Sequence, residues 1–309
     1  MGYDAKILAD SVSPIGHRLT TFEVTFPRIV LAEFNTHRVF SRNSASSRAI
    51  PVKKMLERVR ENPFVPAVWG KNQKGMQASS EVLEDEDLAR ADFAWRELRN
   101  HAINTAHFLA VPEEQGGLDV HKQIPNRLLE PWLWHTVIVS ATEWGNFFNL
   151  RDNKKAQPEI HKAADLMHQL HLASKPLDLS SKQWHLPLVT EAEMVEASID
   201  WVKVSAGRCA RVSYLTHDGK RDPVEDLRLH DSLLESGHMS PLEHPARPMT
   251  LSELLMFEQP HRVWDAGVGG WLTISGRETH FLGNYNGWVQ YRKLVPGEAD
   301  IHTHRGTQA

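Results

Sequence analysis

The sequence predicts an α+β fold, in which a mixed or antiparallel sheet is flanked by helices. Residues 18–26 alternate apolar and polar side chains, as a half-buried strand does. Residues 84–110 carry apolar side chains at helical spacing and predict a long amphipathic helix. Motifs of the first half also recur in the second half, which predicts an internally repeated, shortened second unit.

The first 80 residues are expected to form a strand, a helix and two loops. The strand at 18–26 is followed by Pro27, which fits the first turn of a helix, so residues 27–38 are predicted to be helical. Residues 41–49 consist mostly of short polar side chains and predict a loop. Residues 70–80 are rich in Gly, Gln and Lys and predict a surface loop.

The rest of the chain is expected to be mainly helical. Residues 127–151 are heavily apolar and predict a mostly helical segment at the centre of the core. Residues 172–189 predict a connector to a second region. Further helices are expected at 158–173, 191–214, 222–237 and 285–294.

The composition is that of a globular protein. The 309 residues are 41% hydrophobic, which is too apolar for a disordered chain, and a net charge of -4 gives no bulk attraction for nucleic acid. No apolar run approaches the roughly 18 residues of a membrane span, and the first residues lack a signal-peptide pattern. One cysteine, Cys209, excludes an internal disulfide and a cysteine-based zinc site. We therefore expect a cytoplasmic protein that binds neither nucleic acid nor membranes.

Three short motifs of the first half recur in the same order in the second half. The pairs are 13–17 (SPIGH) with 240–244 (SPLEH), 37–40 (HRVF) with 261–264 (HRVW), and Trp144, Phe147 and Arg151 with Trp288, Tyr291 and Val295. The recurrence predicts a duplication, with residues 1–190 as the catalytic half and residues 191–309 as a degenerate copy.

The densest group of polar side chains lies between Thr36 and Arg48. It contains His37, Arg38 and Arg42 together with several serine hydroxyls. Guanidinium groups, hydroxyls and backbone N–H groups are the donors that bind phosphate. The segment is a candidate phosphate site, although a solvated basic loop fits the composition equally well.

Two arginines, Arg127 and Arg151, are embedded in otherwise apolar segments. A buried guanidinium needs an anionic partner, which either the protein or a ligand can supply. The sequence offers Glu130 and Glu143 as partners for a structural salt bridge. Both interpretations stay open at this point.

Other reactive side chains point to packing roles. His161, His168 and His171 share one helical face, but no carboxylate that would complete a metal site is evident. Cys209 lies within an expected helix, which favours a core thiol over a nucleophile. No metal is therefore expected.

The polar segment resembles the signature of the flavin-dependent thymidylate synthase (ThyX) family. That signature is Arg-His-Arg, then seven residues, then Ser; His37 and Arg38, seven residues and Ser46 match it here, with Ser41, Asn43 and Arg48 in register. Further segments resemble other family motifs, in an unusual order: 127–131 (RLLEP), 146–160, 210–214 (ARVSY), 237–244 and 283–291.

The resemblance implies an enzyme that methylates C5 of a deoxypyrimidine monophosphate, converting dUMP to dTMP. Family members take the carbon from methylenetetrahydrofolate and the hydride from reduced FAD, with NADPH as the reductant of the flavin. They need no thiol nucleophile, which agrees with the position of Cys209 outside every matched site motif.

The resemblance also implies roles for individual residues. The cofactor-binding residues would be His37, Arg38, Ser41, Asn43, Asn146 and His244. The substrate-binding residues would be Glu33, Ser44, Ser46, Arg48, Arg127 and Arg151. Arg151 would be catalytic, because a cation beside the pyrimidine carbonyl stabilises a developing enolate. His17 is a competing match for the family histidine near the flavin.

The chain departs from the family pattern at four positions. Thr36 replaces the first Arg of the signature, and Thr142 stands where Arg is common. Glu33 replaces a usual Gln and Ser44 a frequent Glu; an ionised carboxylate only accepts hydrogen bonds and would suit the amine of cytosine. Alternatives are therefore a dCMP substrate, a hydroxymethyl product, or a catalytically silent homologue that binds flavin or nucleotide.

Family enzymes are usually homotetramers whose active sites are built across subunits. If residues 191–309 occupy the place of one subunit, a homodimer that resembles this tetramer is expected. The sequence does not decide whether residues 191–309 contribute to the active site.

Overall fold

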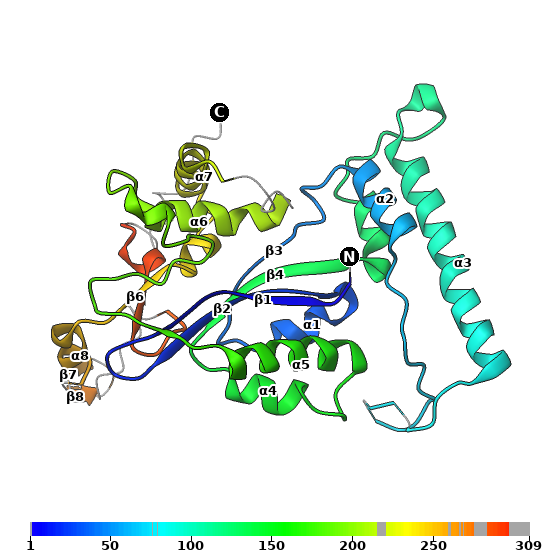
Figure 1. Cartoon of the computed structure of the whole chain (residues 1–309). Helices are drawn as coiled ribbons and strands as arrows, with labels where there is room; N and C mark the ends of the chain where they lie inside the picture. The colour runs from blue at the N-terminus through cyan, green and yellow to red at the C-terminus, as the bar shows by residue number, and fades with distance from the viewer. Residues whose placement is uncertain are drawn as a thin grey trace.

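The computed structural model describes residues 2–75, 77–78, 80–214, 221–258, 261–265, 267, 269–274 and 283–296. A five-stranded sheet in the order β3–β4–β2–β1–β5 forms its centre (Figure 1). The strands are β1 (Asp4–Val12), β2 (Arg18–Pro27), β3 (Ser41–Ser44), β4 (Trp134–Ala141) and β5 (Leu177–Asp178). Among the described strands of this sheet, β1 and β5 pair in parallel and the other pairs are antiparallel, so the predicted mixed sheet with flanking helices is confirmed.

One face of the sheet carries the main hydrophobic core. Phe22, Val24 and Phe26 of β2 point to this face and are buried against residues of three helices. These helices are α1 (Leu31–Asn35), α4 (Gly145–Arg151) and α5 (Pro158–Ala173), which lie on one side of the sheet in Figure 1. A buried apolar strand face and the apolar faces of helices thus form one cluster.

The second face of the sheet is polar but also buried. Thr21, Glu23 and Thr25 of β2 are less than one tenth exposed, so the strand is not half-buried as expected. The second region covers this face: Cys209 of α6 (Trp201–Arg211) packs on Ile138 of β4. The remaining described elements of that region are α7 (Pro223–Glu235), η6 (Ser240–Glu243), β6 (Ala246–Pro248), α8 (Leu251–Glu258), β7 (His261–Asp265), β8 (Gly270–Ile274), β9 (Trp288–Gln290) and η7 (Tyr291–Leu294).

A second core lies beside the sheet. It joins α2 (Val52–Glu61), the long α3 (Asp85–Ala110) and η3 (Pro125–Trp132), which stand together at one end of the molecule in Figure 1. The predicted helix 84–110 is thereby confirmed, as is the helix 158–173. No helix in the described part of the chain is long and apolar enough to cross a bilayer.

The other short 3-10 helices are η1 (Arg28–Val30), η2 (Glu113–Gln115), η4 (Glu193–Val195) and η5 (Val212–Tyr214).

The prediction of a loop over 41–49 is wrong for its first four residues, which form β3. Polar side chains can occupy this buried strand because the second region satisfies them. Gln290 Nε2 donates to Ser41 Oγ at 2.9 Å, and Asn43 Nδ2 donates to the Cys209 carbonyl at 2.7 Å. Both partners lie more than 160 residues away in the sequence.

The prediction of a mostly helical segment over 127–151 is also wrong. The β-branched run at 137–139 lies in β4, a central strand buried on both faces, and such strands have continuous apolar sequences rather than alternation. A helix expected at 285–294 is instead β9 followed by η7, and the helix expected at 191–214 begins only at Trp201. The helix expected at 27–38 is limited to η1 and α1.

The internal repeat is not confirmed, because the paired segments differ in local structure. Residues 13–17 form the turn between β1 and β2, whereas residues 240–243 form η6. Trp144 precedes α4, whereas Trp288 lies in β9. The domain boundary near residue 190 therefore stays a prediction.

Buried histidines account for part of the high histidine content. His185 contacts Thr21 Oγ1 and Ser11 Oγ, and His244 contacts Ser140 Oγ, all between the sheet and the second region. Burial lowers the pKa of both histidines to about 3. The charge of Asp10 opposes this shift at His185, whereas His185 adds to it at His244. Burial is also the first cause that lowers the pKa of His135 to about 3 and of His37 and His171 to about 4.

We predict that these five histidines make the fold sensitive to mild acid. The unfolded chain takes up protons below about pH 6.5, whereas the folded histidines stay neutral until about pH 4 or 3. The free energy of unfolding should therefore fall as the pH falls from 6.5, by up to about 1.4 kcal/mol per pH unit for each histidine. Urea unfolding at pH 7, 6 and 5 measures it. Equal midpoints at the three pH values would contradict the prediction.

Candidate functional site

Two distant parts of the chain meet at His37. Arg151 at the end of α4 donates from Nε to His37 Nε2 at 3.1 Å and from Nη2 to Thr36 Oγ1 at 3.3 Å. The contact forms because α1 and α4 pack together through Phe34 and Phe147, whose ring centroids are 5.6 Å apart. The helix expected to carry a catalytic arginine therefore ends at the signature histidine.

Two guanidinium groups, of Arg151 and Arg42, lie near His37, and that of Arg38 lies near Arg42. Arg42 Nη1 donates to the carbonyls of Phe34 and His37 at 3.4 and 3.3 Å. Burial, followed by the charges of Arg151 and Arg42, lowers the pKa of His37 to about 4, so the neutral ring accepts a hydrogen bond from Arg151. Burial also lowers the pKa of Arg42; Glu243 opposes this shift and Arg38 adds to it.

We call Arg38, Arg42, Arg151 and His37 the arginine cluster. In the described part of the chain, none of its three arginines forms a hydrogen bond or ion pair with a carboxylate. Positive charge that is only partly offset, by Glu243 near Arg42, is a suitable environment for a bound anion.

A second group of expected site residues lines a cavity of about 410 Å³. Asn43, Ser46 and Arg48 belong to β3 and the loop after it, and His121 and Gln123 precede η3. The second region supplies Ser213, Leu233, His238 and Ser240. Both halves of the chain therefore build this cavity, which we call the shared cavity.

Hydrogen bonds between the two halves hold one wall of the shared cavity. The backbone N–H of Ser46 donates to the Ser213 carbonyl at 3.2 Å. Ser213 Oγ and Ser240 Oγ donate to Asn43 Oδ1 at 3.4 and 3.5 Å. The loop that carries Ser46 and Arg48 is thus fixed by residues of the second region.

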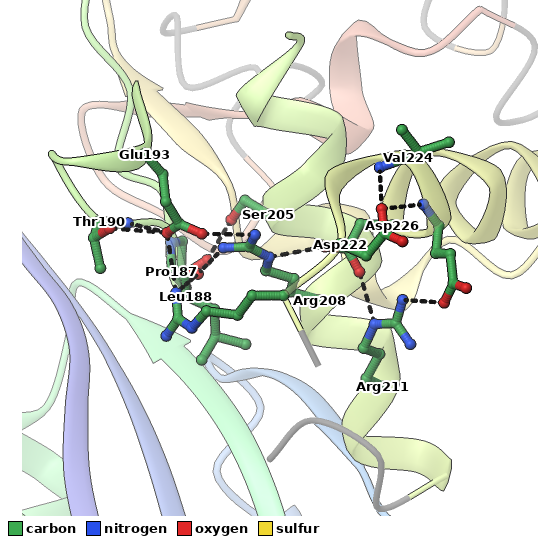
Figure 2. A network of polar contacts seen from close by, with 12 residues as sticks. Pro187, Leu188, Thr190, Glu193, Ser205, Arg208, Arg211, Asp222, Val224 and Asp226 are labelled. Carbon is green, nitrogen blue, oxygen red and sulfur yellow. Dashed lines mark hydrogen bonds and ion pairs between the residues drawn. The ribbon is translucent and has the colours of Figure 1, made fainter. Parts of the chain in front are cut away.

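An ion-pair network joins the helices behind this wall (Figure 2). The buried Asp226 of α7 accepts from Arg208 Nε at 2.9 Å and from Arg211 Nε at 2.7 Å, both on α6. Arg208 also pairs with Glu193 at 2.8 Å, which ties η4 to α6. A Cβ at Gly207 would lie 2.3 Å from the Asp226 carbonyl oxygen, so glycine permits the close approach of α6 and α7.

The other expected cofactor residues lie apart from each other. Ser41 accepts from Gln290, as described above, while Asn146 is exposed on α4. His244 is fully buried, and its Nε2 has no hydrogen-bond partner among the described residues. The competing match, His17, is exposed in the turn after β1.

The other expected substrate residues also lie outside the shared cavity. Ser44 is half-buried in β3, and Glu33 lies on α1 with its Oε2 buried and without a partner in the described part of the chain. Arg127 was expected to be buried, but its side chain is 55% exposed and lies 3.6 Å from Glu130. Because Arg127 is at the surface, its charge needs no ligand. Glu143 instead accepts a hydrogen bond from Asn286.

The structure places a carboxylate near the histidines of α5 that was not predicted from the sequence. Asp152 lies 2.6 Å from His168 Nδ1 and 3.5 Å from His161 Nε2. His168 also stacks on Phe148, with ring centroids 4.4 Å apart. No group of ligands with metal-binding geometry is present among the residues that the structure describes.

Cys209 is a core thiol, as expected. It is fully buried in α6, and burial raises the pKa of the thiol well above its usual range. A thiol in this state is a poor nucleophile.

Comparison with protein-family models agrees with the resemblance. The family model described as thymidylate synthase complementing protein (Thy1) matches residues 6–176, which is more than half of the chain. No curated protein matches significantly. Two solved structures of flavin-dependent thymidylate synthase ThyX from Helicobacter pylori, both with FAD and dUMP, match at 18% identity and a TM-score of 0.33. The matches cover 50% of this chain and 68% and 67% of those chains.

Proposed function

We propose that this chain, which belongs to the thymidylate synthase complementing protein family, is a flavin-dependent enzyme that methylates C5 of dUMP to give dTMP. The observation that carries the proposal is the shared cavity, where Ser46 and Arg48 of the signature segment lie with polar residues of the second region. Its volume of about 410 Å³ is in the range of small-ligand sites.

Within the shared cavity, Arg48 would bind the phosphate of the nucleotide. A guanidinium offers paired donors that match phosphate oxygens. Ser46 and Gln123 offer neutral donors and acceptors for the sugar and the base. Leu233 adds an apolar surface against which a pyrimidine can pack.

The arginine cluster fits the pyrophosphate of FAD, because none of its three guanidinium groups forms a hydrogen bond or ion pair with a carboxylate of the described residues. Arg38 is exposed and available to that anion. When bound, FAD supplies the hydride that completes the methyl group, after methylenetetrahydrofolate has provided the carbon and NADPH has reduced the flavin.

Arg151 is proposed to act on the pyrimidine ring. Its hydrogen bonds to His37 and Thr36 fix the guanidinium, while Nη1 has no partner in the described part of the chain. A fixed cation beside a pyrimidine carbonyl stabilises the negative charge that develops when C5 acts as a nucleophile. Arg151 is not among the residues that line the shared cavity, so we propose a homo-oligomer in which it reaches the nucleotide of a second copy.

Reconstitution tests the proposed function. We expect the purified protein to bind FAD and turn yellow, and to form dTMP from dUMP, methylenetetrahydrofolate and NADPH. Mass spectrometry of the nucleotide measures the reaction, with samples that lack folate or FAD as controls. Protein that binds FAD and dUMP without forming any product would instead support a silent homologue.

A dCMP substrate is a second candidate, favoured by the Oε2 of Glu33, which has no hydrogen-bond partner among the described residues. Glu33 lies outside the shared cavity, so, like Arg151, it would reach the nucleotide of a second copy. Such an oxygen can accept a hydrogen bond from the amine of cytosine. Assays with dUMP and dCMP side by side separate the two substrates, and mass spectrometry separates a methyl from a hydroxymethyl product. Preference for dUMP in both the wild type and Glu33→Gln would remove this candidate.

A further inference from the structure

We infer that His121 and His238 bind the substrate phosphate together with Arg48, so that the second region completes the nucleotide site of its own chain. The inference rests on the proposed function of the shared cavity. It assigns the phosphate site to three basic side chains from separate parts of the sequence. It also gives residues 191–309 a part in substrate binding that the family motifs alone do not decide.

The charge of the lining is the first argument. Arg48, His121 and His238 all line the shared cavity, and none of the lining residues is acidic. The remaining polar residues are serines and amides, which are neutral. A cavity lined by basic and neutral groups favours an anionic ligand over a neutral or cationic one.

The hydrogen bonds of His121 are the second argument. The backbone N–H of Gln123 donates to His121 Nδ1 at 3.4 Å. With Nδ1 acting as the acceptor, the neutral ring carries its proton on Nε2. This N–H has no partner within the described residues, so His121 can donate it to a phosphate oxygen without any change of charge.

The hydrogen bonds of His238 are opposite in direction. Ser236 Oγ donates to the Ser232 carbonyl at 2.7 Å, so it acts as the acceptor for His238 Nδ1, which lies 2.9 Å away. In a neutral His238 ring, Nε2 then carries a lone pair and no proton. A phosphate dianion would be repelled by this lone pair. His238 must take up a second proton to donate through Nε2, and a neighbouring anion favours that protonated form.

This difference predicts that nucleotide binding takes up a proton at His238 and not at His121. The charged groups that face the ring across the shared cavity are Arg48 and His121, both basic. Neither supplies a negative charge beside His238. The phosphate provides that charge, so proton uptake should accompany binding.

Calorimetric titration of the full chain with dUMP and with deoxyuridine, which lacks the phosphate, tests the inference. We expect His121→Asn and His238→Asn each to weaken dUMP binding about tenfold and to leave deoxyuridine binding unchanged. Titrations in buffers with different ionisation enthalpies should reveal proton uptake in the wild type and His121→Asn but not in His238→Asn. His238→Arg should restore the affinity, because it restores a cation.

Controls separate the possible failures. His101→Asn on the exposed face of α3 should bind like the wild type, and equal urea midpoints should establish that the variants are folded. A wild type that does not bind dUMP would overturn the proposed function itself. A wild type that binds dUMP, with both histidine variants binding equally well, would overturn the assignment of the phosphate site alone.

Discussion

Replacing Arg151 by alanine is expected to lower the turnover of dUMP by about a hundredfold or more and to leave FAD bound. The reason is electrostatic: removing one fixed donor from a developing negative charge costs about a hundredfold to a thousandfold in rate. His37 and Thr36 hold the guanidinium in one orientation. Steady-state dTMP formation measures the loss, and flavin absorbance after gel filtration reports the retained FAD.

A matched control is Arg90→Ala, because Arg90 lies on α3 with its side chain 75% exposed. Its turnover should equal that of the wild type. Wild-type activity in Arg151→Ala would refute the proposed role. Loss of FAD together with activity would assign Arg151 to the cofactor instead of to the reaction.

The same variant tests whether Arg151 acts on the nucleotide of a second copy. If Arg48 and Arg151 of one site come from different copies of a homodimer, mixing inactive Arg48→Ala and Arg151→Ala proteins after subunit exchange restores activity. Random pairing leaves about a quarter of the sites intact. Light scattering gives the oligomeric state of each variant and of the mixture. No recovery in a mixture that has exchanged subunits would place both arginines in the same chain.

Some elements of this fold can be predicted from neighbouring residues alone, whereas others depend on contacts between residues far apart in the sequence. β2 could be predicted because alternation along one strand is a local property. β3 could not, because its polar side chains are buried only through partners such as Gln290 and the Cys209 carbonyl. The sequence wrongly predicts a helix at β4, because periodicity does not distinguish a strand buried on both faces from a buried helix.

The residues of the candidate site also fall into two groups: some can be found from their spacing in the sequence, and others are brought together only by folding. Neighbours in the signature, such as Ser46 and Arg48, line one cavity and could be found together from their spacing. The contact of Arg151 with His37 depends on packing between α1 and α4, which neither the residue pattern nor the family resemblance predicts. His121 and His238 belong to no strong motif, and folding alone brings them to the shared cavity.

Replacing Asp226 by asparagine is expected to lower the free energy of unfolding by about 3–5 kcal/mol. Asp226 is fully buried and accepts from Arg208 and Arg211, whose side chains are only 4% and 10% exposed. Asparagine keeps the shape but removes the negative charge, which leaves two buried guanidinium groups less neutralised. Losing one partner of a buried ion pair costs more than the pair itself contributes, because the remaining charges cannot reach water.

Urea unfolding followed by circular dichroism measures this loss, and Asp87→Asn is the matched control. Asp87 forms the same kind of pair with Arg90 at 3.2 Å, but both side chains are more than two thirds exposed. Exposed pairs contribute about 1 kcal/mol or less, so the control should unfold close to the wild type. Because α6 and α7 carry one wall of the shared cavity, Asp226→Asn should also weaken dUMP binding at urea concentrations that leave Asp87→Asn unaffected. Equal stability of the two variants would mean that Asp226 is not the charge that holds these helices together.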